Sequence, residues 1–524
     1  MTKSINILLI TADQWRAECL STLGHPVLKT PHLDALAADG VLFRNHYAQC
    51  VPCGPSRASL LTGMYMMNHR SVCNGTPLDA RFSNIGLEAR KLGYEPGLIG
   101  YTDTTYDPRV LPELDSSRER YSNVMPGFVQ LVPGSEGGMS FVTQLADFQG
   151  AAPWLRDLAT KGYEIPGCGR TIYDPVPDYP GAEERGPTYA PPIFRAEDSD
   201  TAFMVDRSIE AMTMPTRSPW FLHLSLLRPH PPFIAPEPYN AMYHPDEVPE
   251  FRRASTPESE AESHPYAAYM QRHHLKLEGL DPTTHPNVEP AMRQLRATYY
   301  GLMSEVDHNI GRIIAALKAS GEYDNTMIVF ASDHGEQLWD HWVLGKGSHF
   351  DQSVQIPLII RAPGSFAEEG RGRVVEAFTE NIDVMPTILD MLGCEVPLQC
   401  DGRSLTPFLA GDAPDDWRQE VHWEIDFRDV LNGKPEQEMG LRLDACSLCV
   451  LRDRRYKYVH FTALPPLLYD IAADPNELAN LAGDPGHAEV LAEYAQKMLS
   501  WRMAYAERTL TGLYNDFERP RTQR

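Results

Sequence analysis

The chain is poor in cysteine, short of positive charge and without a long apolar run. Its nine cysteines are an odd number scattered over 524 residues, which excludes a disulfide-rich secreted scaffold. Acidic residues outnumber basic ones by 71 to 47, and the net charge of −24 argues against nucleic acid and against a membrane as partners. No segment is apolar enough for a membrane helix, and residues 5–10 are too short for a signal-peptide core. We therefore expect a soluble cytoplasmic protein.

Short apolar runs alternate with helical patterns along the chain. Each run ends in polar residues. A short continuous apolar run of this kind is typical of a strand that is buried on both faces of a parallel sheet. Helical spacing over residues 31–41 and 295–321 separates these runs, and Gly321 suits a helix end. This alternation predicts an α/β fold with a large, mainly parallel sheet flanked by helices. The expected strands lie within residues 5–15, 95–104, 219–233 and 325–337.

The predicted organisation has three parts. Residues 1–400 would form the catalytic α/β domain, in which the proline-rich stretches 107–196 and 236–290 would make the walls and lid of a site. Residues 401–499 would form a smaller C-terminal α+β domain, because a β-hairpin pattern is followed there by a turn and a helix. Residues 500–524 would be a tail that acts as an arm in a homo-oligomer, a dimer or a tetramer.

Polar residues follow four of the expected strands directly. Because ligands bind at the carboxyl ends of the strands in open α/β sheets, these residues are expected at one rim. A single aspartate after a strand is more often a turn or a helix cap, so the joint arrangement carries the argument. Two carboxylates, an amide and an imidazole suit a hard or borderline divalent cation. The residues are Asp13 and Gln14, Tyr101 and Asp103, His230, and Asp333 and His334.

The stretch CVPCGPSRASLLTG, residues 50–63, places a thiol where a helix should begin. Pro55 suits the first helical turn and Gly63 suits the helix end. Cys53 would then lie at the positive end of the helix dipole beside Arg57, where an oxyanion or thiolate is stabilised.

Several interpretations of this thiol stay open from the residues alone. It could be a buried structural cysteine, a thiolate nucleophile or a cysteine that is later modified. It could also form a redox pair with Cys50, since the two make a C-x-x-C motif. A second C-x-x-C, Cys446 and Cys449, allows a four-cysteine zinc site, although the two pairs fall in different predicted domains.

The segment Cys53-Gly54-Pro55-Ser56-Arg57 with its downstream L-T-G resembles the sulfatase signature C-x-P-S-R. The stretches RPHPPF, SDHGEQLWDH, NIDVMPTILDMLG and CDGRSLTPFL extend the resemblance over nearly the whole chain. In this wider pattern the chain is most similar to the phosphonate monoester hydrolases of the alkaline phosphatase superfamily. The resemblance implies an alkaline phosphatase/sulfatase-like fold. It also implies that formylglycine-generating machinery oxidises Cys53 to formylglycine.

The resemblance also implies roles for single residues. One divalent metal ion, Mn²⁺ or Ca²⁺ with Mg²⁺ and Zn²⁺ as alternatives, would be held by Asp13, Gln14, Asp333, His334 and the modified Cys53. Catalytic roles fall to the modified Cys53, to Arg57 for orienting it, to Lys346 for the substrate oxygens and to His230 near the leaving oxygen. Substrate-binding positions match Asn74, Tyr101 and Asp103.

The expected reaction is hydrolysis of a small anionic ester. One hydroxyl of the hydrated aldehyde attacks sulfur or phosphorus, and the second then loses its proton so that C–O cleavage releases the inorganic group. We expect arylsulfatase-type hydrolysis of sulfate monoesters, with phosphonate monoester and phosphodiester hydrolysis as companions.

Three alternatives to this expected function remain. The chain could be primarily a phosphonate monoester hydrolase, a phosphatase or phosphomutase with an unmodified nucleophile, or a zinc-stabilised binding protein without catalysis. The loop Gly100-Tyr101-Thr102-Asp103 bears on the choice among ester substrates. It stands where common sulfatases have G-K-x-H, and this loss of positive charge favours monoanionic esters over phosphate monoesters.

Overall fold

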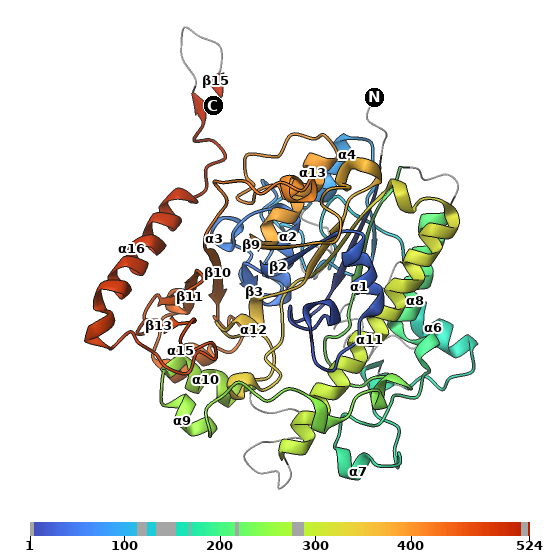
Figure 1. Ribbon diagram of the computed structural model, residues 1–524, viewed down its shortest axis with the longest axis horizontal. Coiled ribbons are helices and arrows are strands. Elements are labelled where there is room, and N and C mark those ends of the chain that lie inside the picture. Colours follow the sequence, from blue (N-terminus) through green and yellow to red (C-terminus); the bar gives the residue numbers. More distant parts are fainter. Residues whose placement is uncertain are drawn as a thin grey trace.

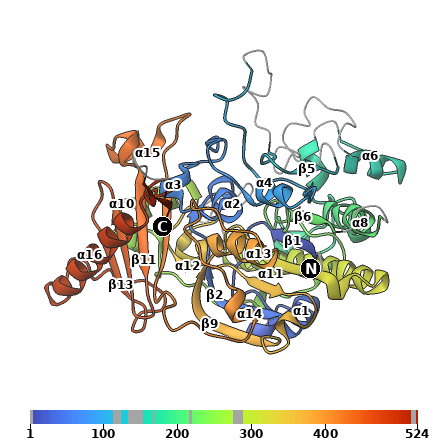
Figure 2. The same cartoon turned by 90° about the horizontal axis from the view of Figure 1, so that it is seen from above.

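The computed structural model describes residues 5–112, 123–132, 153–166, 169–214, 219–274, 288–514 and 522–523. Two sheets dominate this part of the chain and lie beside each other, with helices packed around them (Figures 1 and 2). Parts of the stretches 107–196 and 236–290 and of the tail 500–524 lie outside the described residues.

The larger sheet has eight strands and is mainly parallel, as predicted. Only β8 runs antiparallel to its neighbours β7 and β2. Every residue of the three central strands is buried, which explains why those segments read as continuous apolar runs. The order across the sheet is β5 (Val129–Gln130), β4 (Gly97–Ile99), β6 (Phe221–Leu226), β1 (Asn6–Ala12), β7 (Thr326–Ser332), β8 (Leu358–Arg361), β2 (Val41–Tyr47) and β9 (Arg373–Glu380).

A hydrophobic core lies on each face of this sheet, because alternate side chains of a strand point to opposite faces. In β1, Leu8 and Ile10 belong to one core, whereas Ile7 and Leu9 belong to the other. The first core is covered by α1 (Pro31–Ala38), α8 (Asp200–Thr213) and the long α11 (Val288–Ser320). The second is covered by α2 (Cys53–Thr62), α4 (Ile85–Lys91) and α13 (Val384–Met391).

The smaller sheet includes the predicted C-terminal hairpin, and α16 (Ala488–Ala504) packs against it (Figure 1). Its edge strand β3 comes from the N-terminal part of the chain and pairs in parallel with β10. The two residues of β3 lie just before Cys53, so the second sheet holds the chain at the start of α2. The strand order is β13 (Leu467–Asp470), β12 (Tyr456–Phe461), β11 (Ser447–Arg452), β10 (Val421–Asp426) and β3 (Cys50–Val51).

The topology explains why distant segments meet. Strands β4, β6, β1 and β7 are consecutive in the large sheet and mutually parallel, so their carboxyl ends lie along one edge. The polar residues that follow these four strands therefore share one rim, as expected for an open α/β sheet. None of the helices in the described part of the chain combines the length and apolar content needed to cross a bilayer.

Candidate active site

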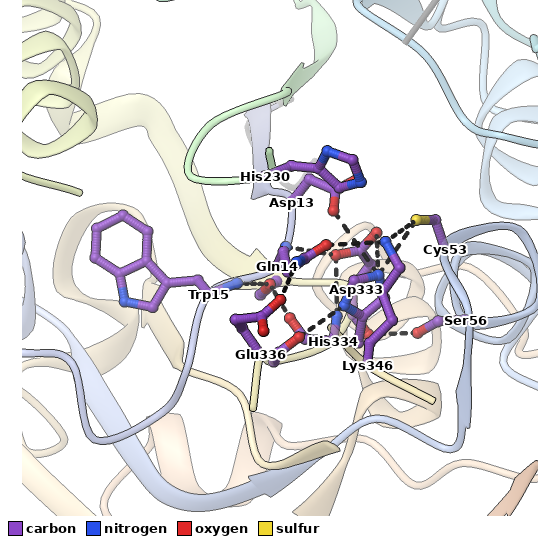
Figure 3. A network of polar contacts seen from close by, with 12 residues as sticks. Asp13, Gln14, Trp15, Cys53, Ser56, His230, Asp333, His334, Glu336 and Lys346 are labelled. Carbon is purple, nitrogen blue, oxygen red and sulfur yellow. Dashed lines mark hydrogen bonds and ion pairs between the residues drawn. The ribbon is translucent and has the colours of Figure 1, made fainter. Parts of the chain in front are cut away.

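Cys53 is the first residue of α2, at the predicted helix mouth. Gly63 ends the helix in the left-handed conformation with φ 70°. The Ser56 hydroxyl, one turn along, donates a hydrogen bond to the Asp333 carbonyl at 2.5 Å and so ties the helix to the end of β7. Cys53 is 5% exposed, and its sulfur therefore faces the interior of the rim (Figure 3).

Arg57, the residue after Ser56 on α2, is buried and donates several hydrogen bonds. Its guanidinium donates to Asp13 Oδ2 and Asp333 Oδ2, both at 3.0 Å. It also donates to the Tyr101 carbonyl at 3.1 Å and the Ser225 hydroxyl at 2.6 Å. Arg57 therefore holds the two carboxylates, and these four bonds go to groups other than the Cys53 thiol.

The two carboxylates occupy one buried site and differ in their acidity. Burial would raise the pKa of Asp13, but the charges of His230, Lys346 and Arg57 outweigh it and lower that pKa well below its usual range. Burial and the neighbouring Asp13 raise the pKa of Asp333. Asp13 therefore carries the negative charge more readily of the two.

The sulfur of Cys53 lies between an ammonium group and an imidazole. Lys346 Nζ is 2.9 Å from Sγ, and His334 Nε2 is 3.2 Å from it (Figure 3). The His334 Nδ1 is 3.0 Å from the Gly335 carbonyl, so Nδ1 carries the proton and Nε2 offers its lone pair. Burial and three carboxylates raise the pKa of the Cys53 thiol, which is the opposite of what an activated thiolate requires.

The amide of Gln14 joins the same group. Its oxygen accepts a hydrogen bond from Lys346 Nζ at 2.9 Å, and its backbone N–H donates to Asp333 Oδ1 at 3.1 Å. Its NH₂ group donates to the buried carboxylate of Glu336. Gln14 has a positive φ of 72°, an uncommon conformation for a non-glycine residue, and these bonds hold it there.

His230 follows β6 and lies over Asp13 in Figure 3. Its Nδ1 is 2.8 Å from the Pro231 carbonyl, so Nδ1 donates there and Nε2 remains available as an acceptor. Burial and the nearby ammonium of Lys346 lower the pKa of His230 to about 4. Arg228 donates to the His230 carbonyl at 3.1 Å and fixes this segment.

The three expected substrate-binding residues lie around the start of α2. Asn74 Oδ1 accepts from the Gly54 N–H at 2.9 Å. Tyr101 is buried, donates its hydroxyl to Asp13 Oδ2 at 2.5 Å and lies with its ring 4.3 Å from the Arg57 guanidinium. The half-buried Asp103 has φ 54° and lies close enough to Cys53 for its charge to raise the pKa of that thiol.

These residues fit a divalent cation. One ligand atom from each of Asp13, Cys53, Asp333 and His334 can be chosen so that all four lie within 4.8 Å of one another. Asp13 Oδ1 is buried and accepts no hydrogen bond from any described residue, so its lone pairs are available to a cation. Two carboxylates, an imidazole and the Gln14 carbonyl make a donor set of the type predicted.

A chamber of about 1040 Å³ opens beside Lys346 and Asn74. Helix α10 (Pro265–His274), from the second proline-rich stretch, forms one wall, and the end of β10 with the following loop forms another. The apolar walls of the chamber include Val51, Tyr266, Tyr269, Met270, Ile425 and Phe427.

Comparison with known proteins places this geometry in a family. The family model described as Sulfatase matches residues 5–394, three quarters of the chain. The chain belongs to the sulfatase family. A second model, described as N-sulphoglucosamine sulphohydrolase, C-terminal, matches residues 339–504. The predicted α/β fold of the alkaline phosphatase/sulfatase type and the predicted ester hydrolase class are thereby confirmed, and the non-catalytic binding protein is excluded.

Individual relatives of this sulfatase-family hydrolase carry several names. The chain is 45% identical to the multifunctional alkaline phosphatase superfamily protein PehA of Trinickia caryophylli, and the match covers 97% of this chain and 96% of that protein. The structure of the phosphonate monoester hydrolase of Agrobacterium radiobacter matches with 44% identity and a TM-score of 0.90, over 99% of both chains. An arylsulfatase of Clostridium perfringens is 28% identical over 94% of this chain and 93% of that one.

The zinc interpretation of the cysteines is wrong. Cys50 and Cys449 lie on β3 and β11, on either side of β10, which separates them by two strand spacings of about 10 Å in total. Cys53 contacts neither of them and instead meets Lys346 and His334. Cys50 and Cys53 are not joined by a disulfide, and their sulfurs have different neighbours: Cys50 Sγ lies 3.5 Å from the Ser59 hydroxyl, whereas Cys53 Sγ meets Lys346 and His334.

Two residues of this sulfatase-family site escape sequence analysis. Ser225 lies inside strand β6 and reads as a strand residue, although its hydroxyl accepts from Arg57. Glu336 stands three residues after Asp333 in SDHGEQ, a polar stretch that the structure buries completely, and no local pattern distinguishes it there. Its side-chain partner Gln14 lies more than 300 residues away in sequence.

Proposed function

We propose that this sulfatase-family hydrolase is a metal-dependent, formylglycine-type enzyme for monoanionic esters. Phosphonate monoesters and phosphodiesters are its foremost substrates, and sulfate monoesters are a companion activity. The observation that carries the proposal is the charge facing the nucleophile. Among the described residues, Lys346 is the only lysine or arginine with a contact to Cys53 Sγ.

One ammonium group facing the reacting centre suits a substrate with one negative charge. Arg57 is occupied by its four acceptors, and Asp103 adds negative rather than positive potential next to residue 53. A phosphate monoester approaches two negative charges at neutral pH. The second charge would cost about 1–4 kcal/mol near a carboxylate at 4 Å, depending on the effective dielectric.

The size and lining of the chamber favour esters with two organic groups. A phosphonate monoester or phosphodiester keeps one organic group after the leaving group departs, whereas a sulfate monoester keeps none. The chamber beside Lys346 has the volume and the apolar walls to receive such a group. The relatives at 44–45% identity bear the names of a phosphonate monoester hydrolase and a multifunctional protein, and the arylsulfatase is at 28%.

The nucleophile is formylglycine, made when separate machinery with an external oxidant converts the Cys53 side chain to an aldehyde. In the hydrated form, one hydroxyl attacks phosphorus or sulfur in line with the leaving alcohol. Lys346 stabilises charge on the transferred oxygens from the position that it now takes against Sγ. The second hydroxyl then loses its proton to His230 Nε2, the aldehyde reforms, and breakage of the C–O bond releases the phosphonate, phosphate or sulfate.

Other side chains prepare the site for this reaction. Asp13, Gln14, Asp333 and His334 would hold the metal ion, which when bound supplies Lewis-acid stabilisation of negative charge. Arg57 fixes the two carboxylates in place through its two 3.0 Å bonds. Tyr101 holds Asp13 from the other side.

A panel of nitrophenyl esters tests the substrate class. We expect kcat/KM for a phenylphosphonate monoester and a diester to exceed that for the phosphate monoester by tenfold or more. Lys346→Met should lower all of these values by two or more orders of magnitude, because one positively charged contact is lost. Lys318→Met, on the outer side of α11, is the matched control and should act like wild type. A phosphate monoester as the best substrate would refute the proposed class.

Peptide mass mapping tests the nucleophile. We expect an aldehyde mass at position 53 in active protein and an unmodified thiol at Cys50. Cys53→Ala should abolish turnover, while Cys394→Ser, a cysteine remote from the rim, should not. A fully active enzyme with an intact Cys53 thiol would instead support the phosphatase or phosphomutase alternative with an unmodified nucleophile.

A further inference from the structure

Glu336 is a fully buried carboxylate to which the proposed reaction assigns no step. It is 0% exposed and lies on the loop after β7, three residues beyond Asp333. Its Oε1 accepts the backbone N–H groups of Leu338 at 3.0 Å and Gly345 at 2.5 Å. Its Oε2 accepts from the NH₂ group of Gln14 (Figure 3). All three donors are N–H groups, so Glu336 acts here purely as an acceptor.

The contacts of Gln14 fix which end of its amide faces which neighbour. An ammonium group has no acceptor, so the Gln14 atom at 2.9 Å from Lys346 Nζ must be the oxygen. The NH₂ group then points to the other side, where Glu336 receives it. An ionised carboxylate cannot donate, so it accepts only this end of the amide and blocks the flipped orientation.

We propose that Glu336 is a positioning residue that orients the Gln14 amide, with its oxygen on the side of Lys346 and the candidate metal site. The same contact explains why a neutral amide, and not a second acid, follows Asp13. A carboxylate at position 14 would face Glu336 without a donor N–H between the two groups, so the pair would repel or have to bind a proton, in a site that already holds Asp13 and Asp333. The inference rests on the proposed metal site but is independent of the ester that is hydrolysed.

This pairing predicts that amide and acid can be exchanged. In the double variant Gln14→Glu/Glu336→Gln, the amide at position 336 can donate its NH₂ group to the acid at position 14. Its oxygen can still accept from Leu338 and Gly345, as Glu336 Oε1 does alone now. The swap keeps side-chain volume and total charge, whereas each single variant loses the matched donor and acceptor.

The experiment compares wild type, Glu336→Gln, Gln14→Glu and the double variant after removal of metal with a chelator. Isothermal titration with Mn²⁺ and with Ca²⁺ gives the dissociation constants, and thermal unfolding in chelator gives the melting temperatures. We expect Glu336→Gln to bind both ions 10- to 100-fold more weakly, as for other residues that orient metal ligands. We expect Gln14→Glu to melt below wild type and the double variant to recover most of that loss.

Each other outcome is decisive. Unchanged dissociation constants in Glu336→Gln, with or without a lower melting temperature, would mean that Glu336 only braces the loop and would overturn the proposal. A double variant whose melting loss equals the sum of the two single losses would also overturn it. If Gln14→Glu fails to fold, a folded double variant supports the pairing and an unfolded one contradicts it. Absence of metal binding by wild type would refute the metal site of the proposed function, while the melting data would still decide the pairing.

Discussion

Arg57→Met is the substitution for which the structure makes the sharpest prediction. The guanidinium is 1% exposed and joins Asp13 and Asp333, whose carboxylates lie in one buried site. Methionine keeps much of the volume but removes the charge and all of the hydrogen bonds. Removing one partner of a buried ion pair typically destabilises a protein by about 3–5 kcal/mol, because the remaining charge is left uncompensated.

A bound cation should restore much of this loss. Asp13 and Asp333 are the same carboxylates that would hold the metal, so the ion replaces the missing positive charge. We therefore expect Arg57→Met to be less stable than wild type by about 3–5 kcal/mol in chelator, and by clearly less in excess metal. Metal would stabilise the variant more than it stabilises wild type.

Chemical denaturation with and without divalent metal measures this difference. Arg296→Met is the matched control, since that buried arginine binds Asp340 at 3.0 Å away from the metal-binding residues. The control should also lose stability, with the same metal increment as wild type. Equal metal increments in Arg57→Met, Arg296→Met and wild type would refute the shared-charge account of the site.

Two further predictions concern acids outside the set of metal ligands. Asp103→Thr should narrow the preference for monoanionic esters over phosphate monoesters, since it removes negative potential beside residue 53; an unchanged ratio of kcat/KM values would contradict this. Burial and Asp200 raise the pKa of Glu305 from 4.5 to about 8. Between these values the folded state keeps the Glu305 proton and the unfolded state loses it, so the contribution of Glu305 to stability falls as the pH rises. Glu305→Gln should show a shallower fall than wild type, and parallel stability curves from pH 5 to 8 would refute the prediction.

The sequence alone was enough to locate most of the candidate site. The continuous apolar runs that are followed by Asp13 and Asp333 form strands buried on both faces. They could be predicted because the hydrophobic pattern of a sequence indicates which residues are buried. The helix start at Cys53 follows from proline in the first turn and glycine at the end, because these residues restrict or permit particular backbone angles. The rim itself follows from the general rule for open parallel sheets.

Only the tertiary structure shows which side chains meet at that rim and what lies around it. Gln14 and Glu336 interact because β1 and β7 are neighbours, and strand order is not encoded in the pattern of either strand. The pairing of β3 with β10 likewise joins segments more than 300 residues apart and positions the start of α2. The local sequence pattern indicates which residues are buried and which backbone angles they prefer, whereas the side-chain contacts that orient the site depend on how the whole chain packs.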